Sequence, residues 1–204
     1  MGGLHHITGI TAYFPKANVD TDQLIPARFM SVPRSEGYGD YLLYDQRRDA
    51  YGQLDPRFPL NTDKPPSVLI AERNFGSGSS REAAVYALVD AGFQAVIAPS
   101  FGDIFSSNAV NNGLLPLRLD EQDHAELVAC HKTHPDLSTE IDLDTCQLRL
   151  GSFERVFMLD ETWRLKLING WDDIDMTKQH LSSIEGYRER AFNITPWAWP
   201  NGVK

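Results

Sequence analysis

The sequence has few cysteines, no long apolar run and no excess of basic residues. Two cysteines among 204 residues, Cys130 and Cys146, are too few for a disulfide framework or a four-thiolate cluster, and idle thiols suit a reducing cytoplasm. No run of about 18 apolar residues occurs and no charged segment leads into an apolar one, so we expect neither a membrane span nor a signal peptide. The net charge of −9 argues against nucleic acid as a partner. Together these features predict one soluble domain over residues 1–204.

Histidines give no clear metal site either. His124, His131 and His134 could be drawn as a zinc set, but no cysteine or carboxylate spacing supports a closed site, so we expect surface histidines. The pair His5 and His6 is expected to be solvated. The sequence therefore predicts no metal bound by this chain.

Residues 68–92 form the most informative segment. Its first four residues, Val68 to Ala71, are all apolar, which favours a strand buried on both faces. Gly76 and Gly78 then alternate with serines, and glycines in a turn let a ligand approach the backbone. Apolar residues at three- and four-residue spacing follow until Gly92, which predicts a helix with a left-handed C-terminal cap. The segment is typical of a strand, a turn and a helix N-terminus that attracts anions.

Two interpretations of the turn stay open. Ser79 and Glu82 have the spacing of a capping box, in which Ser79 would be only the N-cap of the helix. The adjacent Ser80, the two glycines and Arg81 instead favour a ligand site, because a cation in a first helical turn is unfavourable unless an anion compensates it. Arg81 also offers a planar fork of donors that suits a carboxylate.

The rest of the chain predicts an α/β fold. Strands over 95–98 and 114–119 alternate with helices over 103–110 and 121–131, which indicates a largely parallel sheet with helices packed on it. The polar residues near the strand ends are mostly typical of turns, and they include Ser100, Asn108, Asn111 and Asn112.

The C-terminal third predicts a hairpin, a helix and a tail. Residues 141–150 and 155–159 alternate enough to form a β hairpin. A helix is expected to begin near residues 172–175, and its apolar positions suit one buried face; they are Ile174, Leu181, Ile184 and Tyr187. The tail, residues 190–204, is apolar and rich in tryptophan, so we expect it to pack on the body or on a partner.

Three motifs occur together in a fixed order. They are DTDQLIPARF at 20–29, NFGSGSSRE at 74–82 and APSFGDIFSSNAVNNGLLPL at 98–117. With these spacings the chain resembles, over nearly its whole length, the aconitase superfamily, and within it most closely the small subunits of 3-isopropylmalate dehydratase. The resemblance implies a three-layer swivelling-domain fold, with a mostly parallel sheet, flanking helices, a small β hairpin and a C-terminal helix.

The resemblance also implies a chemistry. It suggests a hydro-lyase that interconverts 2- and 3-isopropylmalate by dehydration and rehydration in leucine biosynthesis. Ser79 would be the base, working as an alkoxide, and Ser80 and Arg81 would bind a substrate carboxylate. Asp22 would orient a histidine of the partner, and Thr21 and Asn74 would support the site. A 4Fe–4S cluster would be carried by a separate large subunit, so this chain alone would be inactive.

Residues 31–64 stand where this family has its substrate-recognition loop. Tyr41, Leu42 and Leu43 would provide an apolar wall for an isopropyl group, or would simply hold the loop on the body, and Arg28 is a second candidate for a carboxylate contact.

Two positions depart from the family pattern. Ala83 replaces a usual histidine, and Ser77 a common cysteine. These departures leave open a paralogue for another alkylmalate or hydroxyacid, of the methylmalate, dimethylmalate or homoaconitate type. They also leave open a non-catalytic module that only binds anions.

Overall fold

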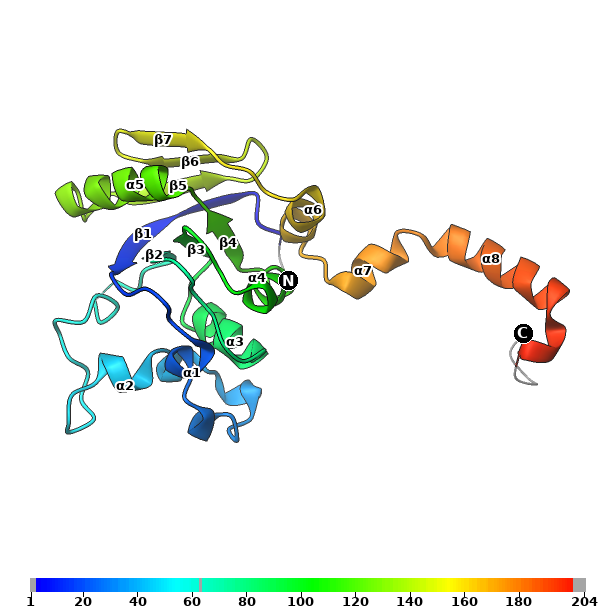
Figure 1. The fold of residues 1–204 in the computed structure, drawn as a ribbon, viewed down its shortest axis with the longest axis horizontal. Helices are drawn as coiled ribbons and strands as arrows, with labels where there is room; N and C mark the ends of the chain where they lie inside the picture. The colour runs from blue at the N-terminus through cyan, green and yellow to red at the C-terminus, as the bar shows by residue number, and fades with distance from the viewer. Residues whose placement is uncertain (1–2, 63, 200–204) are drawn as a thin grey trace.

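An α/β body and a helical arm make up the structure, a computed structural model that describes residues 3–62 and 64–199 (Figure 1). The strands are β1 His6–Phe14, β2 Val68–Ala71, β3 Ala95–Ala98, β4 Leu115–Arg118, β5 Ser138–Asp142, β6 Gln147–Leu150 and β7 Phe153–Val156. The α-helices are α1 Thr21–Leu24, α2 Tyr44–Arg47, α3 Glu82–Asp90, α4 Asp103–Asn111, α5 Glu121–Thr133, α6 Glu161–Asn169, α7 Asp173–Lys178 and α8 Leu181–Ile194. Short 3-10 helices cover Ala27–Phe29, Arg34–Glu36, Gly39–Tyr41 and Pro196–Ala198. Within the described ranges, no helix is both long and apolar enough to cross a membrane.

The seven strands form one mixed sheet in the order β4-β3-β2-β1-β5-β6-β7. β1 to β4 pair in parallel, as the alternation of strands and helices predicts. β5, β6 and β7 extend the sheet from β1 in antiparallel fashion, and the predicted hairpin forms as the β6–β7 pair. Residues 141–150, however, are not one strand, because they contain the end of β5, a turn and β6. β1, which the sequence analysis did not predict, lies at the centre and joins the two halves.

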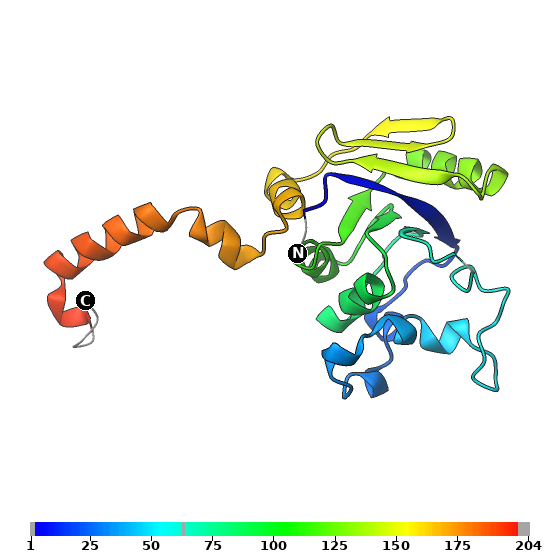
Figure 2. The same ribbon diagram turned by 180° about the vertical axis from the view of Figure 1, so that it is seen from behind.

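The central strands are buried on both faces, as their unbroken apolar runs predict. Along β2 the side chains of Leu69 and Ala71 enter one core, with α3 and the loop of residues 31–64. Val68 and Ile70 enter the opposite core, with α5, α6 and the antiparallel strands. This alternation produces the three layers that Figure 2 shows from behind. Because β1 to β4 run in parallel, the loops that follow them leave at the same edge of the sheet.

The prediction of surface histidines is wrong for two of the three. His124 is only 4% exposed, and its Nε2 lies 2.8 Å from the carbonyl oxygen of Ala71. His131 is also buried, and burial lowers the pKa of its imidazole, so it stays neutral at pH 7. Both lie on the face of α5 that packs against the sheet, whereas His134 is exposed, and so are His5 and His6.

The C-terminal helices do not pack on the body. α7 begins after Asp172, as predicted, but it ends at Lys178, so Ile174 lies on a different helix from the other three apolar positions. Ile174, Leu181, Ile184 and Tyr187 are 42–66% exposed, so the expected buried face is wrong for the chain by itself. The first residues of the tail complete α8, and the expected packing of the tail on the body or on a partner remains a prediction. From α7 onward the chain extends away from the body as an arm, residues 172–199 (Figures 1 and 2). The predicted tail continues to residue 204, and its last five residues lie outside the described ranges.

Candidate functional site

The candidate site lies beyond the carboxyl ends of three parallel strands. Isolated bridges continue the sheet pattern past the strand ends and join Asp20 to Ser77 and Phe75 to Phe101. The loops after β1, β2 and β3 therefore meet at one edge. This edge is where α/β sheets commonly bind their ligands.

Gly76 anchors the loop that follows β2. Its φ is +70°, and a Cβ placed on it would lie 2.2 Å from the ring of Phe105, so the position requires glycine. Its N–H donates to the carbonyl of Val19 over 2.8 Å. A Cβ on Gly102 would similarly lie 2.6 Å from the Gly76 carbonyl oxygen. Phe105 and Gly102, which the sequence analysis did not single out, therefore shape the loop that leads to Ser79.

The capping box does not form. α3 begins at Glu82 with Arg81 at the N-cap position, and no side chain caps the helix. The backbone of Ser79 is instead held through its carbonyl oxygen, which accepts from the N–H of Arg81 at 2.7 Å and from Oγ1 of the buried Thr21 at 3.0 Å. The side chains of Ser79 and Ser80 are exposed. Ser79 is thus a fixed residue whose hydroxyl faces solvent.

Arg81 forms an ion pair with Asp22. Its Nη1 donates to Oδ1 of the carboxylate, and the two side chains are 22% and 56% exposed. A guanidinium has five N–H donors, and this bond uses one of them. Two residues 59 positions apart are thereby placed at the mouth of the Ser79 loop, and the guanidinium already accommodates one carboxylate.

Asparagines brace the site from two sides. Asn74, at φ +59°, receives support from both neighbouring loops: its N–H donates to Oγ of Ser100 and its Nδ2 to Oδ1 of Asn18, both over 2.9 Å. Asn112 donates from Nδ2 to Oε1 of Glu82 over 2.8 Å. All three bonds link segments that are distant in sequence, so none of them could be found from local patterns.

The loop of residues 31–64 packs beside α1 and α3. Leu42 and Leu43 are fully buried in the core, and Tyr41 stacks on Phe29 with ring centroids 4.3 Å apart. Arg28 pairs with the carboxylate of Asp45 on the exposed side of this aromatic group. In this structure these contacts hold the loop on the body, and the predicted substrate contacts of Arg28, Tyr41, Leu42 and Leu43 remain predictions.

Other groups near the site are less suited to be the base. Tyr86 lies one turn along α3, and burial, followed by a hydrogen bond to Glu82, raises the pKa of its phenol, so it stays protonated at neutral pH. Ala83 packs into the core.

A hollow of about 400 Å³ is lined by Asp90 and Ala91 at the far end of α3, so it belongs to a different part of the surface from Ser79.

The donor set of this chain does not fit an iron–sulfur cluster. Cys130 and Cys146 are free and half-buried. In residues 3–62 and 64–199, the group of three potential metal ligands with mutually close donor atoms is His6, Asp142 and Asp144, which contains no thiolate. Iron–sulfur clusters are held by cysteine thiolates, so the described residues offer no ligand set for such a cluster.

The fold and the site define an α/β domain that presents a serine and an arginine at a helix N-terminus. The model of the aconitase C-terminal domain matches residues 1–122. The chain belongs to this family, and the match includes the whole Asp22, Ser79 and Arg81 site.

Several known proteins are similar over most of their length. The 3-isopropylmalate dehydratase small subunit of Shouchella clausii is 41% identical over 184 residues, which cover 89% of this chain and 93% of that protein. The protein with the same description from Rhodopirellula baltica is 42% identical over 185 residues, which cover 89% of this chain and 94% of that protein. The crystal structure of 3-isopropylmalate dehydratase (leuD) from Methanocaldococcus jannaschii superimposes with a TM-score of 0.62 at 26% identity, covering 89% of this chain and 99% of that one.

Proposed function

We propose that this chain is the small subunit of a hydro-lyase that interconverts 2- and 3-isopropylmalate and that works only with a large subunit. The observation that supports this most is the agreement between relatives and geometry. Proteins at 41–42% identity over about nine-tenths of the chain are 3-isopropylmalate dehydratase small subunits. The residues that the resemblance selects, Asp22, Ser79 and Arg81, share one corner of this fold.

The proposed reaction removes water from a pair of neighbouring carbons and adds it back to the same pair, with the hydroxyl on the other carbon. A base takes the proton from the carbon next to a carboxylate, the C–H electron pair becomes the second bond of an alkene, and the hydroxyl leaves the neighbouring carbon. The departing hydroxyl requires an acid, and this chain offers none at the site. In the proposal the large subunit carries the 4Fe–4S cluster, which supplies that Lewis acid when bound.

Ser79 is the proposed base, acting as an alkoxide. An alkoxide needs positive potential, which the N-terminus of α3 and the guanidinium of Arg81 can supply at short range. The two hydrogen bonds to the Ser79 carbonyl hold the backbone of this residue beside the N-terminus of α3. Arg81 and Ser80 would hold a substrate carboxylate beside it.

Co-expression with a matching large subunit tests the proposal. The assembled and cluster-loaded complex is expected to interconvert 2- and 3-isopropylmalate, and each subunit alone is expected to be inactive. Methylmalate and homoaconitate in the same assay measure how strongly the site selects the isopropyl group. Methylmalate differs from isopropylmalate only in its alkyl group, for which an apolar pocket discriminates by about 1–3 kcal/mol, so a modest preference over methylmalate is expected. Absence of turnover in a complex with verified cluster content would contradict the proposal.

A further inference from the structure

The α8 part of the arm exposes an apolar stripe along the helix. On α8 the residues Ile184, Tyr187, Ala191 and Ile194 follow one another at three- and four-residue spacing, which places them on one face of the helix. Leu181, Phe192 and Trp197 continue the apolar surface at the two ends. A stripe of this kind is normally buried, and the described part of the chain buries none of the residues of α8.

The exposed apolar area of the arm is a large share of what a specific interface needs. Tyr187, Phe192 and Trp197 are 66%, 41% and 84% exposed, and with about 150–250 Å² for a whole aromatic side chain these three alone expose on the order of 400 Å². The aliphatic side chains add to this. A stable protein–protein interface buries about 800 Å² on each partner, so the arm supplies a large share of one.

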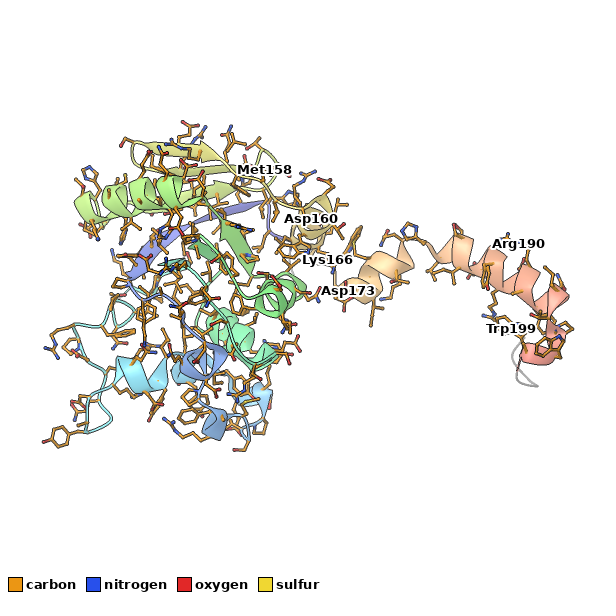
Figure 3. All side chains as sticks on the ribbon, in the orientation of Figure 1. Met158, Asp160, Lys166, Asp173, Arg190 and Trp199 are labelled. Carbon is orange, nitrogen blue, oxygen red and sulfur yellow. The ribbon has the colours of Figure 1, made fainter. Side chains whose placement is uncertain are left out.

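The root of the arm is held by a buried lysine. Lys166 of α6 is 8% exposed on its side chain and pairs with Asp173, the first residue of α7. Its Nζ also donates to Oδ1 of Asn111 over 2.9 Å, and Nδ2 of Asn111 donates to Asp173 over 3.1 Å. Figure 3 shows Lys166 and Asp173 together where the arm leaves the body, and Arg190 and Trp199 far along it. The root contacts give the arm a defined direction of exit, which lowers the entropic cost of binding.

The same corner of the body carries the candidate site. Asn112, the neighbour of Asn111, bonds to Glu82 over 2.8 Å, and Glu82 directly follows Arg81. The arm therefore leaves beside the N-terminus of α3, where Ser79 lies. A second polypeptide that completes the site at this edge also meets the root of the arm.

The observations favour a different protein over a second copy of this chain. The other exposed large apolar side chains of the described body are spread over separate elements and loops; they are Met30, Tyr51, Leu54, Ile104, Leu137, Val156, Met158 and Leu165. A second copy thus presents no body surface that matches the stripe. Matches that cover 89% of this chain also have to extend past Trp171, so the start of the arm is shared with proteins described as small subunits.

We infer that the arm, residues 172–199, is a docking element that binds the large subunit through its apolar stripe. The inference rests on the proposed function, because that function supplies the large subunit. In the complex, an apolar groove of the large subunit covers Ile184, Tyr187 and Ile194. The arm contributes to affinity and takes no part in the reaction.

Two matched double variants of the full-length chain test this inference. Ile184→Glu with Ile194→Glu places two charges on the stripe, and Ser182→Glu with Asn193→Glu places two charges on the polar face of the same helix. All four positions are exposed, so both proteins are expected to fold, which circular dichroism and urea unfolding check. The Kd for the matching large subunit is then measured by isothermal titration calorimetry.

The Kd of the stripe variant for the large subunit is expected to be at least ~30-fold higher than that of wild type, as for the loss of interface hot spots. The Kd of the control variant is expected to stay within about 3-fold of wild type. At saturating large subunit, the kcat of the stripe variant is expected to equal that of wild type. Equal affinity of the stripe variant and wild type would overturn the inference while leaving the proposed function intact. A wild-type chain that dimerises through the stripe, with unchanged affinity for the large subunit, would assign the stripe to a second copy and overturn it too. If wild type itself fails to bind the large subunit, the proposed function fails first.

Discussion

Replacing Gly76 with alanine tests whether the site loop depends on the packing of Gly76 against Phe105. Gly76 and Gly92 both have positive φ, +70° and +96°, but a Cβ on Gly76 would lie 2.2 Å from the Phe105 ring, and one on Gly92 meets nothing within 4 Å. Gly92→Ala therefore measures the cost of the backbone conformation alone, about 1–2 kcal/mol. Gly76→Ala adds overpacking of a buried ring, typically another 1–3 kcal/mol.

Urea unfolding measures the difference. With m-values of about 1–3 kcal/mol/M, the midpoint of Gly76→Ala is expected to fall below that of Gly92→Ala by about 1 M. Phe105→Leu removes part of the ring, so the double variant Gly76→Ala/Phe105→Leu should lose less stability than the two single variants predict together. Activity of the assembled complex should fall for Gly76→Ala, because the loop that carries Ser79 has to move, and should stay near wild type for Gly92→Ala. Equal midpoints for the two alanine variants, or strict additivity in the double variant, would refute the packing argument.

Three further predictions concern the site and the root of the arm. Ser79→Ala should change the free energy of unfolding by less than about 0.5 kcal/mol, because the Ser79 side chain caps no helix. The same variant should lower kcat about 10²–10⁴-fold. A decrease of about 1 kcal/mol in the free energy of unfolding would instead indicate that Ser79 is a helix cap. Thr21→Val removes the Oγ1 donor to the Ser79 carbonyl and should cost about 1 kcal/mol together with a lower kcat. Urea unfolding and steady-state kinetics compare it with Thr8→Val, at an exposed position of β1. The hydrogen bond from Lys166 lowers the pKa of Asp173 from its ordinary 3.8, so this carboxylate stabilises the fold above that pH and the stability is lost as pH falls. The difference in unfolding free energy between wild type and Asp173→Asn should accordingly be constant above about pH 5 and shrink below pH 4; a difference that does not change between pH 6 and pH 3 would contradict the ion pair.

The local parts of the fold could be predicted because their signals lie close together in sequence. The strand at Val68 to Ala71, the turn at Gly76 and the helix that stops before Gly92 each depend on neighbouring residues. Gly92 indeed has the positive φ of a left-handed cap. The capping box failed for a different reason: two helix starts, after Ser79 or after Arg81, are both compatible with the local pattern, and the contact of Thr21 with the Ser79 carbonyl is not visible in it.

Other features depend on where distant segments meet. His124 is polar, and its neighbours in the sequence of α5 include both polar and apolar residues. The sequence therefore does not reveal that its imidazole lies at hydrogen-bond distance from the Ala71 carbonyl. The periodicity of α8 correctly predicts an apolar face, but periodicity cannot tell whether that face is covered by the same chain or by another. The pairing of Arg81 with Asp22 joins two loops through the strand order of the sheet, which single-sequence patterns do not supply.

The central position of β1 has a consequence for synthesis of the chain. β1 emerges first from the ribosome, yet its partner β5 ends at Asp142, so one hydrogen-bonding edge of β1 stays open while more than a hundred further residues are added. At about 5–20 residues per second the interval is on the order of 10 s. An open strand edge is a template for aggregation. A nascent or truncated chain that stops before residue 138 therefore contains Asp22, Ser79 and Arg81 and is nevertheless expected to be insoluble.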